Sequence, residues 1–441
     1  MIKRFIRRVF GLASEHIERV PRSKHGLSRD AISPAASKVC AVLRDGGFSA
    51  YVVGGAVRDL LLGIVPKDFD IATDARPEQV KPLFRRALII GRRFRLVHVM
   101  IGSETVEVST FRAADPDTAE KDEHGRVLRD NVFGTQAEDA RRRDFTVNAL
   151  YFDPATEEVV DFHGGLADLK KRVLRVIGEP DTRYREDPVR MLRAVRLAAK
   201  LGLTLDPATR QPIRELAPLM ERVPPARLFD EMLKLLMSGH ASACVRQLRE
   251  VGLHKGLLPL LDVILEQPLG ERFVTLALAQ TDERVVTERP VSPAFLFAAL
   301  LWHEVLAAWK GREARGERSL AALDTAMDEV LDTQCAKLAI TRKLTATMRE
   351  VWGMQPRFDL RAGQRAYRVL ESPRFRMGYD FLALRAASGE VPAELEAWWR
   401  AFQAADAETR KAMLLPDTGP RKRRRRRRRK KPPPTPAPAP A

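Results

Sequence analysis

Residues 51–73 read YVVGGAVRDLLLGIVPKDFDIAT, and this stretch decides the fold class of the N-terminal part of the chain. Residues 51–53 and 69–73 are short runs rich in β-branched and aromatic side chains, which predicts two strands. Between them, Gly54 and Gly55 predict a tight turn into the start of a helix. Strands that alternate with short helical stretches, such as residues 76–84, indicate an α/β head built on a small mixed sheet.

Two aspartates at the second of these strands are candidate metal ligands. Asp68 and Asp70 stand at i and i+2, and on a strand such residues project to the same face with their carboxylates close together. Carboxylate oxygens suit Mg²⁺, and they suit Mn²⁺ as well. The spacing therefore predicts a Mg²⁺ site of the kind that serves phosphoryl transfer, although the same short pattern is also common in surface loops.

A predicted β-hairpin supplies a further carboxylate. Residues 96–102 (LVHVMIG) and 105–111 (TVEVSTF) are strand patterns joined at Gly102 and Ser103. Glu107 stands between β-branched residues in the second of them. Two interpretations stay open: Glu107 is a third metal ligand, or it is the outward-facing residue of an alternating strand.

Two further segments have the residue types that bind a nucleotide. Backbone amides of the Gly54-Gly55 turn can approach a triphosphate closely, and Arg58, one turn into the helix, can add a charged contact. Asp187 before Pro188 is a good helix start. Asp187 and Arg190, at i and i+3, then project to one side and could hydrogen-bond the edge of a nucleobase, and Arg193 follows one turn later. The alternative for this segment is a capping aspartate with a surface ion pair.

The chain's organisation follows from its composition. A helix over residues 32–43 is expected to end at Gly46 and Gly47, and strand signals fade after Asp187, where long apolar-periodic segments predict helices. We expect five parts: a flexible basic leader (1–30), an α/β head that holds the candidate metal and nucleotide residues (31–178), a helical neck with the candidate base-binding motif (179–240), a helical body (241–415) and a disordered tail rich in Arg, Lys and Pro (416–441).

Charge points to a polyanionic partner. Lys plus Arg is 76 and Asp plus Glu is 58, a net charge of +18, of which residues 421–431 contribute eleven positive charges and leave +7 elsewhere. Cys40, Cys244 and Cys335 show neither a disulfide framework nor a zinc pattern, and a reducing cytoplasm is expected. No segment is apolar enough to span a membrane, although the basic N-terminus (MIKRFIRRVFGL) could form an interfacial amphipathic helix.

Four motifs, in this order, are similar to those of the class II nucleotidyltransferases: GGAVRDLLLG (54–63), KDFDIAT (67–73), RRRDFTVNALYF (141–152) and REDPVRMLRAVRLAAKLG (185–202). That family includes bacterial poly(A) polymerases and the enzymes that add CCA to tRNA. The resemblance implies these roles: metal ligands Asp68 and Asp70, triphosphate contacts Gly54, Gly55 and Arg58, an active-site aspartate Asp144, a ribose or phosphate contact Arg143, and a protein template for the base at Asp187 and Arg190, with Arg193 beside it. A structural alternative for Asp144 is an ion-paired residue that orients the adjacent arginines.

Finer features favour the poly(A) version. Four segments point to a poly(A) polymerase and not to a CCA-adding enzyme: the Arg-rich stretch IGRRFRLVHV (90–99), HGGL (163–166), RYRED (183–187) and the basic C-terminus. The sequence contains no His-Asp dipeptide, so an attached phosphohydrolase domain is not supported. We therefore expect template-independent addition of AMP from ATP to RNA 3′ ends, with RNA, ATP and RNA-decay proteins as partners. CCA addition to tRNA and an inactive RNA-binding adaptor are the alternatives.

Other conspicuous residues are expected to be structural. Two aromatic groups stand at helical spacing among Leu and Ala, which is typical of a core, and neither His98 nor His303 has neighbours in the sequence that indicate a metal site or proton relay. The aromatic residues are Phe295, Phe297, Trp302, Trp398, Trp399 and Phe402.

Overall fold

The computed structural model describes residues 17–91, 95–113, 120–121, 127–129, 132–253 and 268–416. These residues form two compact units, one up to Met348 and one from Arg349. The division falls inside the segment 241–415 that we expected as one body. The predicted N-terminal amphipathic helix, the arginines of residues 92–93 and the tail from residue 417 lie outside the described residues.

Eight strands of the described residues form one mixed sheet in the first unit. Their order is β1 (Glu18–Val20), β10 (Glu158–Asp161), β9 (Leu150–Asp153), β2 (Ala50–Val53), β3 (Asp70–Thr73), β6 (Glu104–Thr110), β5 (Leu96–Ile101) and β4 (Ala87–Ile90). Neighbours are antiparallel except β3 and β6, which are parallel. The mixed sheet and the β5–β6 hairpin at Gly102 are both confirmed. Two small pairs stand apart: β7 (Glu120–Lys121) with β8 (Val127–Arg129), and β11 (Val173–Leu174) with β12 (Thr204–Leu205).

The expected leader is shorter than residues 1–30. Residues 18–20 form β1, which pairs antiparallel with β10 at the edge of the sheet. Glu157, next to β10, accepts hydrogen bonds from the Arg22 side chain at 2.9 Å and from the Arg29 backbone at 2.8 Å. The expectation of a flexible leader is thus wrong for residues 17–30, because backbone pairing with a distant strand gives no local sequence signal.

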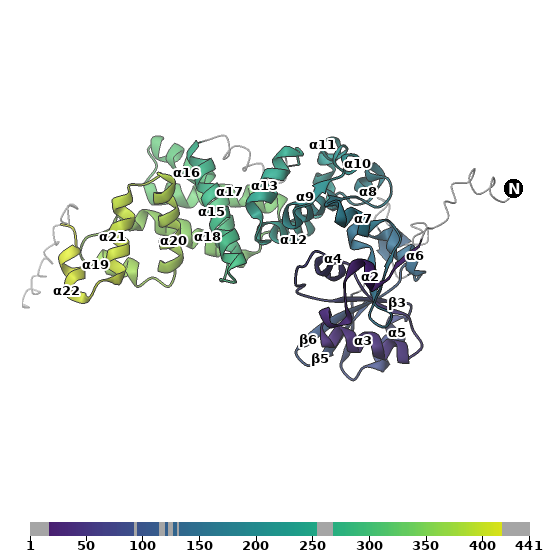
Figure 1. Ribbon diagram of the computed structural model, residues 1–441. Helices are drawn as coiled ribbons and strands as arrows, with labels where there is room; N and C mark the ends of the chain where they lie inside the picture. The colour runs from purple at the N-terminus through teal and green to yellow at the C-terminus, as the bar shows by residue number, and fades with distance from the viewer. Residues whose placement is uncertain are drawn as a thin grey trace, which may run out of the picture. The chain divides into compact units, whose positions relative to one another are not determined.

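Short helices and turns surround the sheet. They are α2 (Arg22–His25), α3 (Pro34–Asp45), α4 (Gly55–Leu61), α5 (Pro77–Val80), α6 (Gln136–Arg142), α7 (Gly165–Lys170) and the 3-10 turns at Arg29–Ala31, Lys81–Leu83 and Thr146–Asn148. The predicted helix is α3, capped by Ser33 and ended at Gly46; it packs on β2, β3 and β6 (Figure 1). α4 packs on β2 and β9, which brings the start of α4 to the edge of the site.

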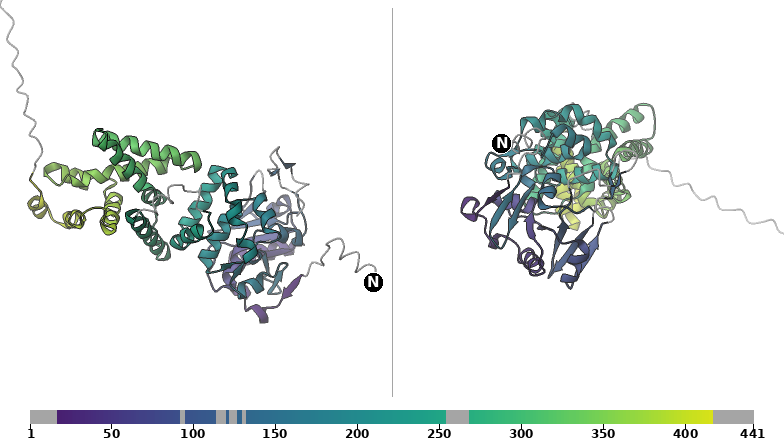
Figure 2. Two further views of the ribbon diagram at one scale, coloured as in Figure 1. Left: turned by 90° about the horizontal axis from the view of Figure 1, so that it is seen from above. Right: turned by 90° about the vertical axis from the view of Figure 1, so that its right-hand side faces the viewer.

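Beyond the head the chain is helical, as predicted, and Figure 2 shows the strands gathered in the purple-to-blue part of the chain. The first unit continues with α8 (Pro180–Glu186), α9 (Val189–Leu201), α10 (Pro207–Arg210), α11 (Ile213–Leu216), a 3-10 turn (Ala217–Arg222), α12 (Pro225–Leu236), α13 (Ala241–Glu250), α15 (Pro268–Val286), α16 (Pro293–Ala314) and α17 (Ser319–Lys337). Next come α18 (Arg342–Met354), a 3-10 turn (Gln355–Asp359), α19 (Gly363–Leu370), α20 (Phe375–Ser388), α21 (Ala393–Ala404) and α22 (Ala407–Met413).

The helix α9 matters most for the site. The side chain of Asp187 accepts a hydrogen bond from the Val189 backbone at 3.2 Å, and Gly202 in the left-handed region ends the helix. One face of α9 is buried by apolar residues such as Met191, Leu192 and Val195. A helix therefore starts next to Asp187 as predicted, but one residue later than expected, because Pro188 and not Asp187 occupies the N-cap position and α9 begins at Val189.

The aromatic residues form cores, as expected. Trp399 and Phe402 are fully buried in the second unit, within a cluster that also includes Phe358 and Leu382. In the first unit Phe297 stacks on Phe229, with ring centroids 5.6 Å apart. None of the described helices is long and apolar enough to cross a membrane.

Candidate active site

Two carboxylates lie on adjacent strands where β3 begins. Asp70 is the first residue of β3, and the parallel register pairs it with Glu107 of β6. Asp68 lies two residues earlier, outside the strand, so the expectation that both aspartates are on the strand is wrong for Asp68. The alternation still holds, because Phe69 is buried while Asp68 and Asp70 are exposed.

The electrostatics of these carboxylates fit a divalent cation. Although Asp70 reaches solvent, the protein around its carboxyl group partly desolvates it, and this desolvation together with the negative charges of Glu107 and Asp68 raises the pKa of Asp70 to about 6. A bound cation would relieve that repulsion. Across the described residues, no three His, Cys, Asp or Glu side chains are grouped to hold a metal ion by themselves. Two carboxylates with oxygens from water and phosphate would suffice, which is the usual coordination of Mg²⁺.

The glycine turn lies beside Asp70. Gly54 has φ 77° and ψ −132°, a conformation that L side chains rarely adopt. A Cβ at Gly54 would approach Nη1 of Arg143 to 3.2 Å. Glycine here therefore lets the backbone and a guanidinium group share one wall of the site.

A cavity of about 430 Å³ joins these elements to α9. Its described lining carries seven basic and three acidic side chains, so it is suited to a polyanion. The lining residues are Gly54, Gly55, Arg58, Asp70, Arg142, Arg143, Asp144, Asn148, Asp187, Arg190, Arg193, Arg196, Leu197 and Lys200. Nine of the ten predicted site residues are among them, and Asp68 is not.

A chain of hydrogen bonds crosses the cavity floor. Arg193 donates to Asp144 at 2.6 and 2.8 Å, and Asn148 Nδ2 donates to the other Asp144 oxygen at 3.0 Å. The Asn148 oxygen accepts from Arg58 at 2.6 Å, and Arg58 also binds Asp59. Burial alone would raise the pKa of Asp144, but Arg193, Asn148 and the Phe145 N–H hold it below its ordinary value. Asp144 is therefore ion-paired with α9, and not with the adjacent arginines that our structural alternative named.

Arg143 is held from the opposite side. Its guanidinium donates to Asp139 Oδ2 at 3.2 and 3.3 Å and to the Tyr151 hydroxyl at 3.2 Å. Tyr151 in turn donates to the same oxygen of Asp139 at 2.7 Å. These contacts fix Arg143 with one edge toward Gly54.

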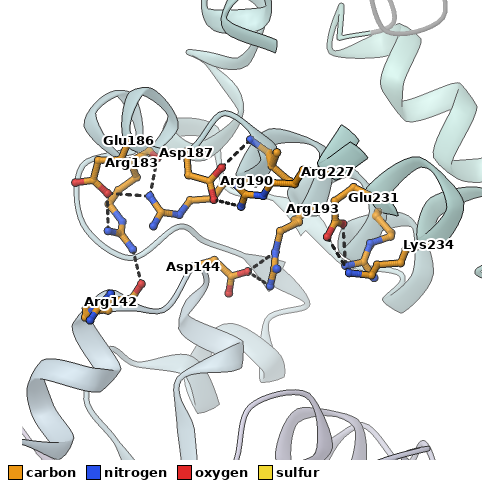
Figure 3. Close-up of polar contacts among 12 residues, drawn as sticks. Arg142, Asp144, Arg183, Glu186, Asp187, Arg190, Arg193, Arg227, Glu231 and Lys234 are labelled. Atoms are coloured by element: carbon orange, nitrogen blue, oxygen red, sulfur yellow. Dashed lines mark hydrogen bonds and ion pairs between the residues drawn. The ribbon is translucent and has the colours of Figure 1, made fainter. Parts of the chain in front are cut away.

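Ion pairs also hold the two residues expected to select the base (Figure 3). Asp187 pairs with Arg227 of α12 at 2.6 Å. Arg190 donates to Glu186 at 2.8 Å and to the carbonyl oxygen of Arg183 at 2.7 Å. The side chain of Arg183 donates to the carbonyl oxygens of Arg142 and Arg143 at 2.8 and 2.7 Å, which ties α8 to the end of α6.

Some lining residues were missed by the sequence analysis. Arg196 and Lys200 continue the stripe of Arg190 and Arg193 along α9, and their spacing of three and four residues was a readable signal. Asn148 was quoted within a motif but not singled out, although it is a polar residue in an apolar run. Arg227 lies forty residues after Asp187 in the sequence, and no local sequence pattern indicated that the two side chains would form an ion pair.

Comparison with known proteins identifies the family of this chain. A family model described as the poly A polymerase head domain matches residues 50–175, and one described as the arginine-rich C-terminus of polymerase A matches residues 315–432. Poly(A) polymerase I of Salmonella typhi is 45% identical over 427 residues, which cover 93% of this chain and 92% of that relative. The chain belongs to the poly(A) polymerase family of nucleotidyltransferases. The predicted class II resemblance and the predicted nucleotidyltransferase activity are thereby confirmed, and enzymes of this poly(A) polymerase family depend on metal ions.

Similarity to CCA-adding enzymes is more limited. The CCA-adding enzyme of Lactobacillus helveticus is 39% identical over 208 residues, 47% of this chain and 50% of that enzyme. The fold is shared more widely: the Bacillus stearothermophilus CCA-adding enzyme in complex with CTP aligns with a TM-score of 0.56 and 26% identity, covering 84% of this chain and 82% of that one. The chain therefore resembles the poly(A) polymerase in sequence along nearly its whole length. It resembles the CCA-adding enzymes in sequence over about half of its length and in fold over most of it.

Proposed function

We propose that this chain adds AMP from ATP to RNA 3′ ends without a template, using the cavity between the head and α9. The observation that carries the proposal is that one cavity brings together the Gly54-Gly55 turn, Asp70 and the Asp187–Arg190 pair. These segments supply, in order, a surface for phosphates, a metal ligand and a polar edge for a base.

Asp68 and Asp70 are the proposed ligands of Mg²⁺, which oxygen donors favour, and Mn²⁺ would suit the same donors. When bound, the metal supplies electrostatic stabilisation of the charge that develops on the attacking and leaving oxygens. Glu107 is the neighbour of Asp70 in the β3–β6 register, so it stays a candidate third ligand, although these three carboxylates are not grouped to hold a metal ion by themselves.

The basic wall is proposed to bind the triphosphate. Gly54 and Gly55 let the backbone approach the phosphates, and Arg58, Arg143 and Arg193 are each held by a carboxylate that fixes their direction. Fixed guanidinium groups stabilise transferring phosphoryl groups without reorganising. In the reaction the RNA 3′ oxygen forms a bond to the α-phosphorus while the bond to pyrophosphate breaks, and the hydroxyl proton leaves to solvent.

Asp187 and Arg190 are proposed to select the base. Ionised Asp187 only accepts hydrogen bonds and Arg190 only donates them. That pair complements the adenine 6-amino group and N1, and it leaves the donors and acceptors of guanine and uracil unpaired. Cytosine shares adenine's pattern, so the choice of ATP over CTP must come from distance. The ion pairs with Arg227 and Glu186 fix the two side chains, and we expect that the smaller cytosine ring would not reach from them to the phosphate wall.

The remaining parts are proposed to bind RNA in the cytoplasm. A family model described as a probable RNA and SrmB-binding site of polymerase A matches residues 202–265, which supports an RNA contact and a protein partner for this segment. That such partners belong to RNA decay stays a prediction. The neck and body boundaries at residues 179–240 and 241–415 remain part of this proposal. The chain's three cysteines are all described and are free thiols, as a reducing compartment allows.

The test is AMP transfer to a defined RNA. The full chain with ATP and Mg²⁺ should lengthen an unstructured RNA and release pyrophosphate in equal amount. The same RNA with a 3′-deoxy end is the matched control and should receive nothing. RNA binding without any extension would instead support the inactive adaptor.

A further inference from the structure

The basic stripe of α9 extends past the residues that the proposed function uses. Arg190 and Arg193 stand in the first turns of this helix, and Lys200 stands in its last turn, before Gly202 ends it. Lys200 lines the same cavity of about 430 Å³ as Asp187 and Arg190. Side chains on a helix lean toward its N-terminus, which directs Lys200 back along the stripe. The cavity therefore has a further cation at the end of the stripe opposite the pair proposed to select the base.

The ammonium group of Lys200 has no carboxylate within ion-pair distance among the residues that the structure describes. The acidic side chain with the strongest effect on Lys200 is Asp59, and Arg58 already binds that carboxylate at 2.6 Å. Arg196, one turn earlier on α9, is paired with Glu231 at 3.5 Å. Lys200 thus keeps its three N–H donors for a ligand, whereas its basic neighbours are held by carboxylates.

The charges around Lys200 favour an anion. Burial lowers the pKa of Lys200, and the carboxylate of Asp59 opposes this shift. Three positive neighbours add to it: Arg58, Arg196 and Lys67. A bound phosphate would offset both the lost solvation of the ammonium group and this repulsion. The three acidic residues of the cavity lining do not compete, since two of them are ion-paired with arginines and Asp70 is the proposed metal ligand.

The length of the nucleotide assigns the ligand. From Arg190 to Lys200 the helix rises by about 15 Å, which is comparable with the length of an extended nucleoside triphosphate. With the base at Asp187 and Arg190 and the α-phosphate at Asp70, the other two phosphates extend along the rest of the stripe. Resting on the proposed function, we infer that Lys200 binds the terminal phosphate of ATP and makes the site prefer a nucleoside triphosphate to a diphosphate.

The same ammonium group could instead bind a phosphodiester of RNA, so the test separates the two sources. Dissociation constants for ATP and for ADP are measured with the full chain, Mg²⁺ and no RNA, at about 0.15 M salt, where the Debye length is about 8 Å. ATP and ADP share the base, the ribose and two phosphates, so contacts to those parts cancel in the ratio of the two constants. KM for an unstructured RNA is measured separately at saturating ATP.

The wild-type chain should bind ATP more tightly than ADP. In Lys200→Met, which keeps most of the apolar stem, the affinity for ATP should fall roughly 10-fold, as expected for the loss of one charged hydrogen bond, while the affinity for ADP should change little. Lys200→Arg should keep part of the preference for ATP, because it keeps the charge. Lys170→Met, at the exposed end of α7 and outside the cavity lining, is the matched control for the loss of one lysine charge and should keep the wild-type ratio.

A dissociation constant reports only on the molecules that bind, so partial misfolding of a variant cannot imitate a loss confined to ATP. An unchanged ratio in Lys200→Met would overturn the inference, and so would equal losses for ATP and ADP. A loss confined to KM for RNA would also overturn it, because it would place an RNA phosphodiester beside Lys200. Failure of the wild-type chain to bind ATP would instead count against the proposed function.

Discussion

At the scale of single residues, the role of each aspartate in the site depends on whether a neighbouring basic side chain balances its negative charge. Asp144 has a partner in Arg193, whereas Asp70 faces Glu107 and Asp68, which carry its own sign. The first arrangement stabilises an ionised carboxylate and the second favours a metal ion. The roles proposed for the two aspartates follow from this difference.

Asp70→Ala is expected to abolish AMP addition, by roughly 1000-fold or more, because a metal ligand that contributes several kcal/mol is lost. The fold should persist, and the metal-free protein should unfold at a slightly higher temperature, since repulsion among carboxylates is relieved. Asp45→Ala, at the exposed end of α3, is the control for loss of one surface carboxylate. Rate assays and thermal unfolding of both variants check this, and substantial activity in folded Asp70→Ala would refute the metal assignment.

Asp144→Asn should be less stable than wild type by about 1–3 kcal/mol at neutral pH, because Arg193 loses a charged acceptor. The pKa of Asp144 is lowered in the folded state, so its stabilising contribution is present above the unfolded pKa of about 4 and is lost as pH falls through the folded pKa. The gap between wild type and variant should thus shrink in acid. Denaturant unfolding across the acid range measures it, and a gap independent of pH would exclude this ion pair as the cause.

Local spacing in the sequence was enough to select residues that lie together in the structure, while their roles stay predictions. Gly54, Asp70, Asp187 and Arg190 stand in short motifs, and all of them line one cavity. It could not find Arg227, because that partner is set by the packing of one helix on another.

At the scale of elements, α9 connects the site to the next long helix of the neck, α12. Its apolar face is buried while its basic stripe lines the cavity, and α12 packs against it. Arg196 of α9 lies 3.5 Å from Glu231 of α12, which is only 5% exposed. The helices were predictable from apolar periodicity, but the ion pairs between them were not. Periodicity shows which face of a helix is buried, and it does not show which other helix packs against that face.

Glu231→Ala should lower the free energy of unfolding by about 1–3 kcal/mol, because it leaves the partly buried Arg196 without its carboxylate. Lys234→Ala, one turn later on α12 and bound to the same carboxylate, should cost no more than about 1 kcal/mol, since this lysine is mostly exposed. Denaturant unfolding of the two variants side by side tests the pair. Equal losses would show that the buried ion pair does not stabilise the α9–α12 contact.

At the scale of the whole molecule, the head fold followed from strand patterns, while the attachment of residues 18–20 to the sheet and the division after Met348 did not. Both depend on contacts between segments far apart in sequence. The basic run at residues 421–431 lies beyond the described residues, and its role stays a prediction from charge.

Truncation after Pro420 removes eleven positive charges and should weaken RNA binding while leaving the rate at saturating RNA unchanged. Each lost phosphate contact should reduce the slope of log affinity against log salt by about 0.7 for single-stranded RNA. Salt titrations of RNA binding by the full and truncated chains provide the measurement. Identical slopes would mean that this run does not contact RNA.

The central claim, a site that accepts ATP repeatedly on RNA without a tRNA fold, is tested most directly by product length. One unstructured RNA is incubated with each of the four nucleoside triphosphates separately, and the products are sized. We expect long tails from ATP and little addition from CTP, GTP or UTP, because the fixed Asp187–Arg190 edge leaves other bases unpaired or out of reach. Addition that stops after a few nucleotides, needs CTP before ATP and occurs only on tRNA would contradict the account.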